Sequence, residues 1–210
     1  LRKMGFFSSR ADPCIWMRQV DDIYEYIAVY VDDLAIASKD PNSIIKTLTE
    51  EYNFKLKGTR PISFHLGCNF FRDEDGVLCF APKKYIDKVI SSYTRMFGSK
   101  PKTNVSSPLE KGDHPEIDTS DCLDDAGIQQ YQSLIGQLQW AISLGRFDIT
   151  TAIMTLSSFR AVPRVGHLER AKRVCGYLSK MRHAIIRIRV DKPDYTSIPD
   201  PEYDWAFSVY

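Results

Sequence analysis

Residues 23–37 read IYEYIAVYVDDLAIA, and this stretch decides the fold expected of the chain. Side chains of residues 23–31 alternate between two faces, with Tyr24 and Tyr26 on one face and Ile27 on the other, as along a strand with one buried face. Two aspartates then interrupt the apolar run, and residues 34–37 resume it. Two short apolar strands joined by a carboxylate tip predict an antiparallel β-hairpin.

The tip of this hairpin is a candidate metal site. Ionised Asp32 and Asp33 repel each other, and this repulsion costs stability unless a cation compensates it. Hard divalent cations such as Mg²⁺ bind carboxylate oxygens and keep coordination sites for phosphate. The alternative is a solvent-exposed turn without a ligand. Adjacent aspartates also occur at 21–22 and 124–125, where a plain turn and a helix start explain them.

Local patterns around this hairpin predict further strands and helices. The sequence predicts a strand over 14–19, a helix capped by Asp40, a second hairpin with strands 62–71 and 77–80, and a helix opening at Pro82. Three apolar patterns of helical spacing follow between residues 131 and 181. The expected fold class is α+β: an antiparallel sheet with packed helices, followed by a small helical subdomain.

A Pro-, Gly- and Ser-rich stretch over 98–120 predicts a linker between two domains. The expected organisation is therefore a sheet-containing domain over 1–97, the linker, a helical region over 121–190 and an extended tail over 191–210. Leu1 is interpreted as a cut end, because the chain does not begin with Met and starts in structured-looking sequence.

Charge is distributed unevenly although the net charge is only +1. Residues 105–145 hold seven acidic side chains against Lys111, and residues 146–189 hold ten Lys or Arg against Asp148 and Glu169. The basic block predicts a phosphate-binding surface, and a solvated helix face is the alternative. Arg170, Lys172 and Arg173 fall off the apolar stripe of the last helix, which is therefore expected to expose positive charge.

Composition excludes several classes of protein. Apolar residues make up 43% and charged residues 26% of the chain, the mixture of a folded globular protein. The longest apolar run, residues 27–31, is too short to span a bilayer, so no membrane association is expected. Five scattered cysteines without a CxxC pair favour a reduced, intracellular environment.

Several motifs, in order, resemble the reverse transcriptase of copia-type retrotransposons. They cover residues 5–178 and include YVDD at 30–33, FHLGCNF at 64–70, KYI at 84–86, YQSLIG at 131–136 and GRFDI at 145–149. The family has Pro where this chain has Phe147, and usually an aromatic residue where it has Leu168. The resemblance implies the second half of a polymerase palm followed by thumb-like helices.

The resemblance also implies an activity and its residues. The reaction is RNA-directed DNA synthesis with Mg²⁺, or Mn²⁺ in its place, in which Asp32 and Asp33 are the catalytic metal ligands. By this resemblance Tyr30 and Val31 line the floor beneath nucleotide and primer end, and the hairpin at Leu66 and Gly67 holds the primer end. An ordinary hairpin core is the alternative for Leu66 and Gly67. The candidate contacts to the nucleic-acid backbone are Arg146, Arg170, Lys172 and Arg173.

The implied partners are an RNA or DNA template with primer, deoxynucleoside triphosphates, and the remaining polyprotein, with integrase upstream and RNase H downstream. The implied location is cytoplasmic, within virus-like particles. The family's fingers and first catalytic aspartate have no counterpart in this sequence, so the fragment alone is expected to be inactive. Two alternatives stay open: a nucleic-acid-binding module without catalysis, and a remnant of a degraded element.

Overall fold

The computed structural model describes residues 1–188, which form two compact units divided between Ile62 and Ser63. Each unit contains a four-stranded antiparallel sheet, and five α-helices complete the described part of the chain. These elements confirm the α+β class predicted from the sequence.

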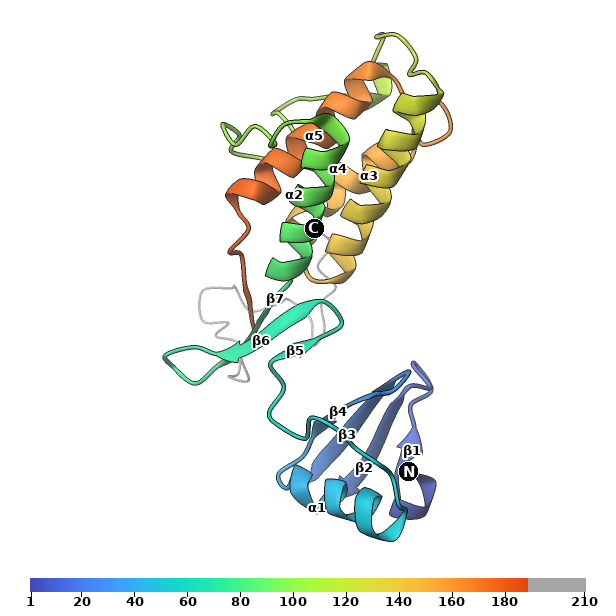
Figure 1. Ribbon diagram of the computed structural model, residues 1–210, viewed down its shortest axis with the longest axis vertical. Helices are drawn as coiled ribbons and strands as arrows, with labels where there is room; N and C mark the ends of the chain where they lie inside the picture. Colours follow the sequence, from blue (N-terminus) through green and yellow to red (C-terminus); the bar gives the residue numbers. More distant parts are fainter. Residues whose placement is uncertain (189–210) are drawn as a thin grey trace, which may run out of the picture. The chain divides into compact units, whose positions relative to one another are not determined.

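The first unit is a sheet with one helical segment across one of its faces (Figure 1). Its strands, in spatial order, are β1 (Phe7–Ser8), β2 (Ile15–Val20), β3 (Ile23–Tyr30) and β4 (Asp33–Ala37). Helix α1 (Pro41–Lys46) follows, and a π-helical turn (Thr47–Glu51) extends it. Asp40 caps α1 as predicted, because its side chain accepts a hydrogen bond from the backbone N–H of Ser43.

Alternation along β3 decides which face of this sheet is buried. Ile27 is fully buried and packs in one cluster with Ile44 and Leu48 of the helical segment. Tyr24 and Tyr26 are exposed and therefore lie on the opposite, open face.

The second unit joins a smaller sheet to a helical bundle. The strands of its sheet, in spatial order, are β5 (Phe64–His65), β6 (Cys68–Arg72), β7 (Leu78–Ala81) and β8 (Ile186–Ile188). Its helices are α2 (Lys83–Phe97), α3 (Asp125–Ser143), α4 (Thr150–Ser157) and α5 (Val165–Lys180). The predicted apolar stripes of all four helices meet in a single core.

Two features of this sheet differ from the prediction. The strand expected over 62–71 is broken at Leu66 and Gly67, whose φ angles of +48° and +90° form a two-residue turn between β5 and β6. Positive φ at both central residues is the geometry of a type I′ hairpin turn. The second difference is β8, which follows α5 in sequence but pairs with β7.

The unit boundary also lies elsewhere than predicted. The stretch 98–120 does not separate two units, because Ile86, Val89 and Tyr93 of α2 pack into the same core as α3, α4 and α5. The division falls instead after a polar, Gly- and Pro-containing segment at 55–61.

The extended tail predicted over 191–210 lies outside the described residues. Within residues 1–188, no helix is both long and apolar enough to cross a membrane.

Candidate functional site

The candidate catalytic hairpin is the β3–β4 connection of the first unit. Tyr30 of β3 pairs with Asp33 of β4, so Val31 and Asp32 are the two central residues of the turn. The sequence placed both aspartates in the interruption, whereas the structure puts Asp33 at the first position of β4. Residues paired across antiparallel strands project from the same face, so Asp33 and Tyr30 stand together.

Backbone strain is concentrated at Val31. Its φ is +51°, in the left-handed region that a β-branched residue rarely adopts, and its side chain is 82% exposed. Asp32 is not among the residues with positive φ, so the turn has the type II′ pattern, in which glycine is usual at the first central position. Strained residues of this kind cluster at functional sites, and no buried contact of Val31 compensates the cost.

We expect Val31→Gly to raise the free energy of unfolding by about 1 kcal/mol, because glycine adopts positive φ without steric penalty. Urea denaturation followed by circular dichroism measures this change. The matched control is Val20→Gly at the end of β2. The φ angle of Val20 is not positive, so this variant should lower the free energy of unfolding. A loss of stability in both variants would show that Val31 is not strained.

Both carboxylates of the hairpin are exposed. Within the described residues, neither Asp32 nor Asp33 forms an ion pair or accepts a side-chain hydrogen bond. Two adjacent, uncompensated carboxylates offer oxygen ligands to a divalent cation and suit Mg²⁺ by donor type. Across residues 1–188, however, no group of three or more His, Cys, Asp or Glu is arranged to hold a metal ion.

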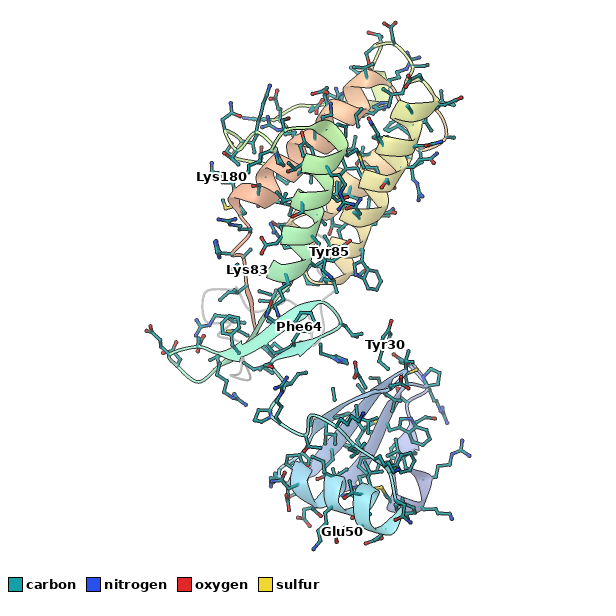
Figure 2. The ribbon with its side chains drawn as sticks, viewed as in Figure 1. Tyr30, Glu50, Phe64, Lys83, Tyr85 and Lys180 are labelled. Carbon is teal, nitrogen blue, oxygen red and sulfur yellow. The ribbon has the colours of Figure 1, made fainter. Side chains whose placement is uncertain are left out.

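The open face of the sheet continues from this tip as an aromatic surface. Tyr30 is 51% exposed at the end of β3 and stands at the hairpin end of the unit, far from Glu50 of the helical segment (Figure 2). Strand register places Phe7, Met17 and Tyr26 in one row across the same face. The carboxylates therefore border a surface on which flat, apolar groups can stack.

Leu66 and Gly67 form the β5–β6 turn of the second unit. A Cβ added to Gly67 would lie 3.2 Å from Cδ1 of Leu144, so the turn sits close to the end of α3. Cys68 reinforces this contact, because its thiol donates to the carbonyl of Leu144 at 3.5 Å. Leu66, the first residue of this anchored turn, is exposed.

Arg146 is a core residue of the second unit. Its side chain is 2% exposed and donates two hydrogen bonds to Asp148, at 2.9 and 2.6 Å. The same guanidinium lies 5.9 Å from the ring centroid of Tyr177. This side chain fixes the turn between α3 and α4, and contact with a nucleic-acid backbone, predicted from the sequence, would require it to leave that ion pair.

Arg170, Lys172 and Arg173 of α5 are also paired within the unit, so the positive charge that these three residues were expected to expose is compensated. Residues 102–120, which we call the strap, run along α5. Arg170 binds Asp113 at 2.8 Å and Asp118 at 2.5 Å, and Arg173 binds Glu110 at 2.9 Å. The remaining candidate, Lys172, binds Glu169 of α5 and lies over the ring of Phe97. The sequence showed both charge blocks but not that they meet.

Asp118 makes the strap sensitive to acid. Hydrogen bonds from Ser120 and then from Arg170 lower the pKa of this carboxyl from 3.8 to about 2. Because the folded pKa lies below the unfolded one, this stabilising contribution is present above pH 3.8 and is lost as the pH falls toward 2.

We expect Asp118→Asn to lower the free energy of unfolding at pH 7 by about 2 kcal/mol, because Arg170 loses a charged partner. The same variant should depend less on pH than the wild type between pH 3.8 and about 2. Urea midpoints measured across this range test both effects, with Asp87→Asn on the exposed side of α2 as the control. Parallel pH profiles for wild type and Asp118→Asn would contradict the pairing.

Fold and site together define an α+β protein with a carboxylate-tipped hairpin on an open antiparallel sheet. Tyr30, Val31, Asp32 and Asp33 share this hairpin in the first unit, whereas Leu66, Gly67 and the four basic candidates belong to the second unit.

Comparison with known proteins relates the chain to transposons. It is 31% identical, over 90% of its length, to the transposon Ty5-1 protein YCL074W of Saccharomyces cerevisiae, of which it covers 60%. It is 29% identical, over 85% of its length, to the retrovirus-related Pol polyprotein from transposon RE1 of Arabidopsis thaliana, and covers 12% of it. It is 27% identical, over 85% of its length, to the retrovirus-related Pol polyprotein from transposon TNT 1-94 of Nicotiana tabacum, and covers 14% of it.

The chain is thus homologous to transposon proteins, including retrovirus-related Pol polyproteins, over most of its length. It spans less than two thirds of each of these relatives. No protein-family model matches the sequence. No solved structure matches it either.

Proposed function

We propose that this chain is part of a copia-type retrotransposon Pol polyprotein and contributes the carboxylate hairpin of an RNA-directed DNA polymerase. The observation that carries the proposal is the β3–β4 tip, where Asp32 and Asp33 are exposed and no described side chain neutralises them. Similarity to retrovirus-related Pol polyproteins over 85% of the chain supports it.

In the proposed reaction, Asp32 and Asp33 hold the catalytic Mg²⁺, or Mn²⁺ in its place. A bound divalent ion stabilises charge that develops on a phosphate during nucleotidyl transfer. Val31 fixes the path of the turn that carries Asp32. Tyr30 stands beside Asp33 on the open face and supplies an aromatic wall for the nucleotide or the primer end.

Leu66 and Gly67 are proposed to hold the primer end. Their support is the type I′ turn anchored against Leu144, since a tight turn on a packed base positions backbone groups precisely. The candidates on α5 and Arg146 can reach a nucleic-acid backbone only after their ion pairs open.

The activity is proposed for the polyprotein and not for these residues alone. Two carboxylates leave a two-metal site incomplete, and the described residues bring no third acidic ligand to the tip. The proposed partners are a primed RNA or DNA template, deoxynucleoside triphosphates, and the integrase and RNase H parts of the polyprotein. The proposed location is within virus-like particles in the cytoplasm.

A second candidate function is nucleic-acid binding without catalysis. It is favoured by the same absence of a third carboxylate near Asp32 within the described residues. Incorporation of deoxynucleotides on a primed RNA template, by a polyprotein that contains this chain and in the presence of Mg²⁺, distinguishes the two. Synthesis supports the polymerase, and duplex binding without synthesis supports the binding module.

A further inference from the structure

A pocket of about 200 Å³ lies in the second unit, beside one edge of its sheet. Three short segments line it: Pro82 after β7, residues 145–148 between α3 and α4, and residues 184–186 at the start of β8. The chain leaves α5 and returns to the sheet, where β8 pairs with β7 and brings the last of these segments into place (Figure 1). The pocket therefore exists only in the folded unit.

The walls of the pocket are mainly apolar, and two large apolar side chains of the wall are open to solvent. Phe147 is 66% exposed and Ile185 is 47% exposed. Gly145 lets the turn between α3 and α4 approach the sheet, because a Cβ at this position would lie 2.7 Å from Cδ1 of Ile186 and 3.0 Å from Cε2 of Phe80. Apolar side chains left in water beside a concave, closely packed base are typical of a surface that binds a partner.

Arg146 supplies the polar group of the pocket. Its two hydrogen bonds to Asp148 use Nε and Nη2. Nη1 is buried and has no hydrogen-bond partner within residues 1–188. A buried donor without an acceptor is destabilising, and native structures usually satisfy such a group. Because burial keeps bulk water away from Nη1, an acceptor that enters the pocket would satisfy this donor.

Charge and size both favour a peptide as the ligand. Arg146 and Asp148 are the charged lining residues, and their ion pair leaves no net charge to attract a phosphate or a free carboxylate. A backbone carbonyl can accept from Nη1 without burying another charge. Pockets for drug-sized molecules hold about 300–1,000 Å³, so this smaller pocket suits one apolar side chain.

The topology of the sheet supplies a way to hold the rest of such a peptide. Within residues 1–188, β8 pairs with β7 alone and forms one edge of the sheet. An edge strand presents a row of backbone N–H and C=O groups, to which an extended peptide can add as a further strand. Ile186 belongs both to β8 and to the pocket wall, so the edge and the pocket are continuous.

We infer that the pocket and the edge of β8 bind an extended segment of a protein partner. The segment adds to β8 through its backbone and inserts one large aromatic or aliphatic side chain beside Phe147 and Ile185. One of its backbone carbonyls accepts from Nη1 of Arg146. This inference goes beyond the proposed function and does not depend on it, because it concerns a protein partner and uses none of the residues of the carboxylate hairpin.

The test is binding of capped peptides to the ¹⁵N-labelled 210-residue chain, followed by two-dimensional NMR. The probe is a capped pentapeptide of threonine with phenylalanine at its centre, and its control has alanine there. We expect the phenylalanine peptide to bind with a dissociation constant of roughly 0.1–1 mM. It should shift the backbone amide signals of Phe147, Ile185 and Ile186 and the side-chain Nε–H signal of Arg146. The alanine peptide should bind at least about 10-fold more weakly, because it lacks the apolar anchor.

Variants of the pocket separate its two contacts. Phe147→Ala removes an apolar wall and should weaken binding of the phenylalanine peptide about fivefold or more. The matched control is Trp140→Ala in α3, which removes an exposed aromatic side chain outside the pocket and should change affinity less than about twofold. Arg146→Lys keeps a positive charge beside Asp148 but removes Nη1, and should weaken binding about fivefold. Circular dichroism melting confirms that each variant folds.

Three outcomes overturn the inference: no binding of the phenylalanine peptide to the wild type, equal affinity for the two peptides, or equal effects of Phe147→Ala and Trp140→Ala. If Arg146→Lys does not fold, an Arg146 side-chain signal that stays unchanged when the peptide binds the wild type rejects the contact with Nη1. Deoxyadenosine monophosphate serves as the nucleotide probe. Its binding at the same signals, with the peptide not bound, would also overturn the inference.

Discussion

Replacing Asp32 by Asn is expected to reduce primer extension by more than about 100-fold, because loss of outer-shell groups alone already costs 10- to 100-fold at metal sites and Asp32 is proposed as a direct ligand. The exposed carboxylate has no partner among the described residues, so the chain loses no stabilising contact. Removing one of two repelling charges should leave the stability unchanged or slightly raised. The rate of deoxynucleotide incorporation on a primed RNA template with Mg²⁺ measures the first effect, and thermal melting the second.

The control is Asp22→Asn, which makes the same chemical change in the exposed turn between β2 and β3. It should leave both the rate and the melting temperature unchanged. Unfolding of Asp32→Asn would mean that Asp32 has a structural role, and equal rates in the two variants would reject the catalytic assignment.

The largest expected effect on stability is that of Gly176→Ala in α5. A Cβ at this position would lie 2.0 Å from the backbone carbonyl oxygen of Lys102, at the start of the strap. Backbone cannot yield as a flexible side chain does, so the strap must detach locally or α5 must shift. We expect a loss of about 3 kcal/mol in the free energy of unfolding, at the upper end of overpacking effects.

Gly136→Ala in α3 is the matched control, because this glycine also lies inside a helix but an added Cβ meets nothing within 4 Å. Alanine should stabilise that helix by about 1 kcal/mol through its higher helix propensity. Urea denaturation of both variants gives the comparison. Effects of the same sign would contradict the close packing of the strap on α5.

The strap explains why the chain needs glycine at two positions of α5. A Cβ on Gly166 would lie 1.9 Å from Oδ2 of Asp118, the carboxylate oxygen that pairs with Arg170. The backbone N–H of Gly166 also donates to Ser120 Oγ at 2.8 Å. The strap and α5 therefore lie so close together at Gly166 and Gly176 that a side chain at either position would collide with the strap.

Local signals in the sequence were sufficient for most elements. Alternation in residues 23–37 predicted the hairpin, Asp40 and Pro41 predicted the start of α1, and apolar stripes predicted α2 to α5. These signals depend on neighbours within a few residues, which the sequence displays directly. The strand pattern over 62–71 did not reveal the break at Leu66 and Gly67, which only the resemblance indicated, because Leu66 gives no sequence signal for positive φ.

For the candidate site, the sequence identified Asp32 and Asp33 as a pair at a hairpin tip, and the structure adds the positive φ of Val31 and the exposure of both carboxylates. For the basic residues, in contrast, the sequence did not show which side chains are paired. Arg170 and Arg173 pair with acidic residues of the strap that lie more than fifty residues away in sequence, and no local pattern indicates such a contact.

The sequence by itself determined β2 to β4, the hairpin of β6 and β7, the helices of the bundle and the carboxylate tip, because each depends on short-range periodicity and turn chemistry. Only the tertiary structure decided which charges are free. Arg170 meets Asp113 and Asp118 across more than fifty residues of chain, and β8 pairs with β7 across more than a hundred. Such contacts depend on how the apolar faces pack, since Coulomb attraction acts between any opposite charges that packing brings within a few ångströms. Packing therefore paired Arg170 and Arg173 of α5 with acidic residues of the strap.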